Sequence, residues 1–215
     1  MTTILPPVPV GARPLAVRRA RLLNRFTIAW NVVEGVVAVT AGLVAGSVSL
    51  IGFGLDSGIE VSASVILAWR LSRERRGGCM AETDRRATRA IAVCFAVLAA
   101  YVWVEAGRDL LEGSRPQASV VGIAMAGLSL MVMPGLARAK RRLAPALGSQ
   151  AAASEANQTM LCAVLSGVVL LGLGLNALAG WWWADPVAAM VIGGLAAAEG
   201  VRTWRADALS DTCCG

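Results

Sequence analysis

Residues 48–71 read VSLIGFGLDSGIEVSASVILAWRL, and only two charged side chains, Asp56 and Glu60, interrupt this run before Arg70. An α-helix needs about 20 predominantly apolar residues to cross about 30 Å of hydrocarbon. A charged group within such a helix costs at least about 2.5–3.5 kcal/mol, so its presence indicates a function. The run therefore predicts a transmembrane helix that carries a site for an ion or for protons.

Five further apolar segments of similar length accompany it, at residues 26–46, 88–107, 118–137, 150–176 and 184–204. The chain is 56% hydrophobic and 16% charged, whereas about a quarter of the residues in a soluble domain are charged. We therefore expect an all-α, integral, multi-pass membrane protein with a bundle of six transmembrane helices. Residues 1–25 would form a basic cytoplasmic arm, residues 26–204 the membrane domain, and residues 205–215 a short cytoplasmic tail.

The basic residues predict the orientation in the membrane. All of the 20 Lys and Arg residues except Arg108 and Arg115 fall on the arm, in or directly beside the loops that follow the second and fourth spans, or at the end of the sixth span and on the tail. Both termini are then cytoplasmic by the positive-inside rule, and we expect a bacterial-type inner membrane. Lys140 belongs to the basic loop that follows the fourth span, so no Lys or Arg is expected within a span at the depth of Asp56 and Glu60.

Several classes of function are not expected. The net charge is +6, but the arginines lie between apolar blocks without interleaved aromatic residues, so nucleic acid is not an expected partner. The sequence has no nucleotide-binding loop or catalytic triad, and we expect neither an enzyme nor a bound cofactor. It has no histidine and five cysteines, for which a disulfide framework is not expected. The cysteines are Cys79, Cys94, Cys162, Cys213 and Cys214.

Asp56 and Glu60 are four residues apart, so they share one face of their helix and repel each other unless a cation, a proton or a basic partner is present. At 1.5 Å per residue, Asp56 lies roughly 12 Å from the outer edge of the membrane and Glu60 roughly 18 Å. The same count along the fifth span places Cys162 level with Asp56, and Gln158 level with Glu60. The four side chains are predicted to meet near the midplane.

The first two spans resemble the first hairpin of the cation diffusion facilitators, a family of divalent-metal exporters. The similar runs are NVVEG at residues 31–35 and SLIGFGLDSGIEV at residues 49–61, and GWWWADPVAAM at residues 180–190 is similar to the start of the family's sixth helix. The resemblance implies a tetrahedral metal site formed by Asp56, Glu60, Gln158 and Cys162. Gln158 stands where the family has His, and Cys162 stands where it has Asp. About a dozen residues follow the sixth span, where the family has a cytoplasmic metal-binding domain.

Carboxylates together with a thiolate suit Zn²⁺ or a similar ion, whereas a neutral Gln158 is better suited to orienting a ligand. We expect a secondary transporter that exports a divalent metal, Zn²⁺ first among them, by antiport with protons that compete for the same carboxylates. Two alternatives are a non-transporting membrane scaffold or regulator, and a permease for a small organic cation. Besides the lipid bilayer, the metal ion and protons, a second copy is a candidate partner, and such a homodimer would rest on membrane contacts alone.

Three other features have structural interpretations. Asn31 and Glu34 share one face of the first span, where they could line a pathway or hydrogen-bond a neighbouring helix. Asp185 followed by a proline predicts a helix N-cap. Gly42 and Gly46 are predicted to let two helices pack closely.

Overall fold

The computed structural model describes residues 13–74, 81–147 and 150–209, and it describes side chains for residues 18–65, 89–143 and 156–205. Six helices make up this part of the chain: α1 (Arg13–Ala45), α2 (Val48–Glu74), α3 (Ala81–Glu112), α4 (Val120–Leu147), α5 (Gln150–Ala179) and α6 (Ala184–Leu209). Each contains a segment long and apolar enough to cross a membrane. The predicted six-helix membrane fold is therefore confirmed. Cys79, Cys213 and Cys214 lie outside the described residues.

The helices are longer than the apolar segments that predicted them. Helix α1 begins at Arg13, so part of the basic arm is helical, and α4 continues through the basic residues to Leu147. Helix formation depends on propensity and hydrogen bonding, and neither stops where the apolar pattern stops. The extension of α4 places Lys140 on a helix instead of in a loop.

Helices α1 and α2 form a tight hairpin because glycines lie at both the turn and the contact. Gly46 has φ = 66°, a left-handed conformation that ends α1. Ser47 then caps α2, since its Oγ accepts a hydrogen bond of 3.2 Å from the backbone N–H of Leu50. A Cβ added at Gly42 would lie 2.9 Å from the backbone nitrogen of Ile51. The packing expected of Gly42 is confirmed, whereas Gly46 is a turn residue with no neighbour within 4 Å of such a Cβ.

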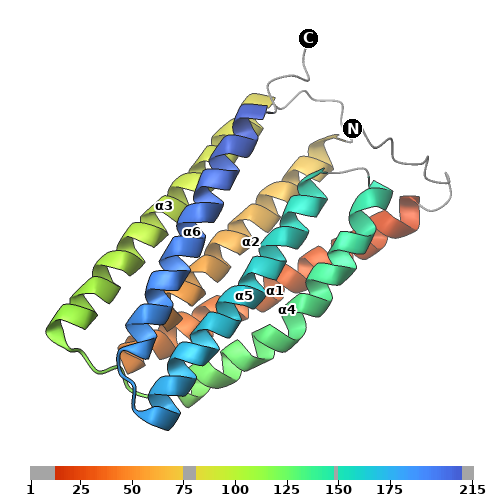
Figure 1. The fold of residues 1–215 in the computed structure, drawn as a ribbon. Coiled ribbons are helices and arrows are strands. Elements are labelled where there is room, and N and C mark those ends of the chain that lie inside the picture. Colours follow the sequence, from red (N-terminus) through yellow and green to blue (C-terminus); the bar gives the residue numbers. More distant parts are fainter. Residues whose placement is uncertain (1–12, 75–80, 148–149, 210–215) are drawn as a thin grey trace, which may run out of the picture.

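Helix α2 lies in the interior of the bundle. The most extensive contacts pair α1 with α2, α3 with α6, and α4 with α5, and α2 also contacts α3, α5 and α6. Figure 1 shows α3 and α6 running side by side on one flank, with α1 and α4 on the other. The polar side chains of α2 are consequently enclosed by other helices.

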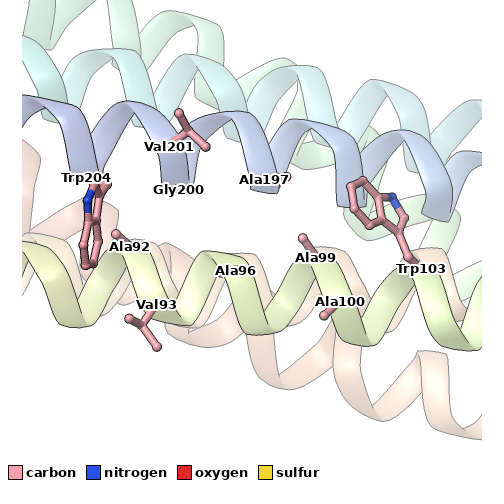
Figure 2. A pocket seen from close by; sticks show the side chains of 10 residues that line it. All are labelled: Ala92, Val93, Ala96, Ala99, Ala100, Trp103, Ala197, Gly200, Val201 and Trp204. Atoms are coloured by element: carbon pink, nitrogen blue, oxygen red, sulfur yellow. The ribbon is translucent and has the colours of Figure 1, made fainter.

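The exterior is apolar, as the bilayer requires. Large hydrophobic side chains are exposed along the spans, including Val33, Val44, Val97, Met131, Leu171 and Val191. An apolar groove of about 460 Å³ lies between α3 and α6. Small Ala and Gly residues line its middle, and Trp103 and Trp204 lie at its two ends (Figure 2). Lipid chains solvate such an apolar surface well, whereas its exposure to water would be unfavourable. The protein is an integral, multi-pass membrane protein.

Candidate cation site

Asp56 and Glu60 are the buried carboxylates of α2. Both lie within the membrane span Val48–Val65, and their exposed fractions are 5% and 4%. The charged groups that act on Asp56 are Glu60, Glu34 and Glu199, all of them acidic. Among the described residues, none donates a hydrogen bond to the Asp56 carboxylate. A carboxylate in this environment is stable only with a cation or a proton nearby.

Glu60 has partners on two other helices. Its Oε1 accepts a hydrogen bond of 3.0 Å from the Thr159 hydroxyl of α5. The same hydroxyl accepts a hydrogen bond of 3.1 Å from Nζ of Lys140, on α4. Thr159 therefore connects a basic and an acidic side chain inside the bundle.

The expectation that no Lys or Arg lies at this depth is wrong. Lys140 falls within the span Val120–Leu143, and only 6% of its surface is exposed. Because α4 continues unbroken past Arg138, Lys140 shares the inward face of Met133 and Ala137, which are seven and three residues before it. This helical spacing was the signal that could have identified Lys140, but its basic neighbours indicated a loop instead.

Cys162 contacts α1. Its thiol donates a hydrogen bond of 3.6 Å to Oε2 of Glu34, and Ser57 donates one of 3.2 Å to the same oxygen. Glu34 is fully buried, so its role as an interhelical hydrogen-bonding group is confirmed, and a role in a pathway stays a prediction. Cys162 also lies within electrostatic range of Asp56 and Glu60. Glu34 thus joins the two helices on which the site was predicted.

Gln158 lies on α5 next to Thr159 but is only partly buried. Thr159 is the α5 residue that reaches Glu60, the contact expected of Gln158. The one-residue offset is a rotation of α5 about its axis by about 100°, which a depth count along the helix cannot detect. Among the described residues, no three Cys, Asp or Glu side chains lie close enough to hold a metal ion in this conformation. The four-residue metal site stays a prediction.

Several buried polar atoms near these residues lack a hydrogen-bond partner in the described part of the chain. They are both side-chain amide atoms of Asn31, together with Oε1 of Glu34 and the Ser129 hydroxyl, which lie beside each other without a hydrogen bond of good geometry. An unsatisfied buried polar group costs about 1–3 kcal/mol, so such atoms indicate a place that takes up water or an ion. We call Glu34, Asp56, Glu60, Thr159, Cys162 and Lys140 the polar centre.

A second buried polar cluster lies at the end of the bundle where α1 meets α2. Asp185 is fully buried and accepts a hydrogen bond of 2.7 Å from the Ser47 hydroxyl. The hydroxyl of Ser49 also donates to it, and the Ser49 backbone N–H does so at 3.5 Å. The predicted N-cap at Asp185 is wrong, because Asp185 is the second residue of α6 and its carboxylate binds the first turn of α2 instead. We call Asp185, Ser47 and Ser49 the serine clamp.

The comparisons with known proteins agree with this architecture. No curated protein matches the chain. Residues 26–210, however, match the cation efflux transmembrane domain, a match that covers the last five membrane spans completely and the first span from residue 26 onward. The buried acidic helix within the six-helix bundle is consistent with cation transport. The chain therefore belongs to the cation efflux family.

Proposed function

We propose that the protein exports a divalent metal cation, Zn²⁺ or a similar ion, from the cytoplasm through a site between α2 and α5. Asp56 and Glu60 are its main ligands. The observation that carries the proposal is Asp56, a carboxylate buried within a membrane span and surrounded by acidic groups. Lys140 lies near Glu60 through Thr159, but no described basic side chain donates a hydrogen bond to Asp56, so a metal cation or a proton is what compensates the negative charge that remains.

The residues opposite α2 favour a borderline-soft ion. A carboxylate and thiolate ligand set is typical of zinc sites. Cys162 is fully buried, and its thiol donates to the Glu34 oxygen that also accepts from Ser57 of α2, so its sulfur lies between α5 and the helices that it faces. Gln158 is a neutral neighbour that orients a ligand or a water molecule.

Proton antiport follows from the chemistry of the same ligands. Protons and metal ions compete for a carboxylate or a thiolate, so binding one releases the other. In this proposal both termini are cytoplasmic, as the distribution of basic residues predicts. Export then requires the helices around the polar centre to rock between inward-open and outward-open arrangements.

The test is flux into proteoliposomes for Zn²⁺, Cd²⁺, Mn²⁺ and a small organic cation, each with and without an imposed pH gradient. We expect Zn²⁺ or Cd²⁺ flux that accelerates when protons leave the metal-receiving compartment. Flux of the organic cation alone would favour a permease. A folded protein that moves no cation, and whose thermal stability does not respond to metals, would favour a scaffold.

A further inference from the structure

Lys140 is the basic residue of α4 that faces the interior. Arg138, Arg141 and Arg142 surround it in the sequence, and all three are exposed, whereas Lys140 is buried. A buried ammonium group is costly unless it is paired with a negative charge and hydrogen-bonded. The buried position of Lys140 therefore has an energetic cost that the exposed arginines do not have, and the contacts that offset this cost must be identified.

The contacts of Lys140 lead to the candidate cation site. Hydrogen bonds of 3.1 and 3.0 Å run from Lys140 to Thr159 and from Thr159 to Glu60. The ammonium nitrogen is thus no more than about 6 Å from Oε1 of Glu60, a distance at which opposite charges in a protein interior attract strongly. Helix α4 packs on α1 and α5 rather than on α2, so the long lysine side chain brings its charge past α5 to an α2 carboxylate.

We propose that Lys140 is a tethered counter-cation, which neutralises Glu60 in the ion-free protein. The transported cation must compete with its ammonium group for the charge of Glu60. This inference rests on the proposed function. A cation that arrives at Asp56 and Glu60 is attracted less strongly, because the positive charge of Lys140 already offsets one of the two negative charges. Lys140 therefore weakens binding and accelerates release.

A fixed charge at this place also contributes to selectivity. The ammonium group competes with a monovalent cation on equal terms, whereas a divalent cation gains about twice the attraction to the same carboxylates. Singly charged ions are consequently disfavoured. No described side chain donates a hydrogen bond to Asp56. Its negative charge therefore remains available to attract the cation, whereas that of Glu60 is offset by Lys140.

The test compares Lys140→Gln with Lys140→Arg and a matched control, Arg141→Gln. Arg141 is exposed and donates a hydrogen bond of 2.9 Å to Asn157, so the control removes one positive charge from the same part of α4 and one contact with α5. Zn²⁺ flux in proteoliposomes gives KM and the maximal rate for each protein. Thermal unfolding measures folding separately.

For Lys140→Gln we expect KM to fall by roughly tenfold or more, because one repulsive charge is removed from a distance of about 6 Å. The maximal rate should fall as well, because the ion is released more slowly. Lys140→Arg should stay near the parent values, and Arg141→Gln should change neither quantity. An unchanged or raised KM in Lys140→Gln, or an equal fall of KM in Arg141→Gln, overturns the proposal.

A second measurement separates this proposal from the proposed function. Lys140→Gln, Glu60→Gln and the double variant form a thermodynamic cycle in thermal unfolding that needs no transport. We expect the double variant to be more stable than the two single effects would give if they were additive, because the attraction between Lys140 and Glu60 is lost in either single variant and is not lost a second time in the double variant. Additive effects overturn the counter-cation role even if the parent transports metal. If the parent moves no metal but the Lys140 and Glu60 variants are clearly non-additive in thermal unfolding, the proposed function and the competition with a transported cation are overturned. The ion pair between Lys140 and Glu60 is then still supported.

Thr159→Val provides the same test if Lys140→Gln does not fold. Valine keeps the shape of threonine but removes the hydroxyl that links Lys140 to Glu60. KM should fall in this variant too, by less than in Lys140→Gln, since the ammonium remains. A KM equal to or above the parent value overturns the role of the link.

Discussion

Two buried aspartates of this bundle, Asp185 and Asp56, have opposite environments. Asp185 accepts hydrogen bonds from two serine hydroxyls and a backbone N–H at the meeting point of α6 and α2. Asp56 lies on α2, two turns further into the bundle, with acidic groups around it and no described donor. The family match covers both residues, so membership alone does not distinguish their roles.

The difference separates a structural carboxylate from one available to a ligand. A buried polar group whose hydrogen bonds are all made holds helices together, and it has little capacity left for an ion. A buried carboxylate without donors is destabilising by itself, and it gains most when a cation arrives. We therefore expect changes in the serine clamp to affect stability and changes in the polar centre to affect transport.

The largest effect is expected for Asp56→Asn. Asparagine keeps the shape and one carbonyl oxygen but removes the charge that offsets metal desolvation. Transport should fall by at least about a hundredfold, equivalent to about 2.8 kcal/mol of lost binding. The melting temperature should not fall, because no described hydrogen bond to Asp56 is lost. Efflux at equal expression, with thermal unfolding in parallel, checks both statements, and undiminished efflux would favour the scaffold alternative.

Asp185→Asn should have the opposite profile. Both serine hydroxyls donate to one oxygen of Asp185 and the Ser49 backbone N–H donates to the other, so the amide nitrogen of asparagine must face a donor at one of these two places, and at least one interhelical hydrogen bond is weakened. The free energy of unfolding should fall by about 1–2 kcal/mol, whereas Zn²⁺ flux per folded molecule should stay close to that of the parent. Retained stability combined with lost flux would mean that the two aspartates have been assigned the wrong roles.

Cys162→Ser is expected to change preference more than rate. A hydroxyl is a harder donor than a thiolate, so the ratio of Zn²⁺ to Mn²⁺ transport should fall by about tenfold. Ser166, one turn further along α5, is not a predicted ligand, and Ser166→Ala is a suitable control. An unchanged ion preference would remove Cys162 from the set of ligands.

Gln158→Ala should have the smallest effect. Gln158 is only partly buried and is proposed to orient a ligand, so transport should fall by less than about tenfold, the lower end for residues that support metal ligands. KM for Zn²⁺ measures the effect. A loss as large as that of Asp56→Asn would make Gln158 a direct ligand.

Much of the fold could be predicted from the sequence, because span length, hydropathy and short turns determine six antiparallel helices. Asp56 and Glu60 could also be identified, since charged residues within a span are conspicuous. Lys140 is easily missed even though its spacing from Met133 and Ala137 indicates a buried position, because a basic residue after an apolar run is normally assigned to a loop. The actual partners of Glu60 and Cys162 depend on how α5 is rotated against α1 and α2. Packing sets this rotation, and a depth count along one helix does not contain it.

The central claim is that Asp56 holds the transported ion, and Zn²⁺ binding measured by calorimetry on the purified protein tests it most directly. The parent and Asp185→Asn should bind with similar affinity, whereas Asp56→Asn should bind at least about a hundredfold more weakly. Binding of Zn²⁺ to Asp56→Asn with the affinity of the parent would contradict the account.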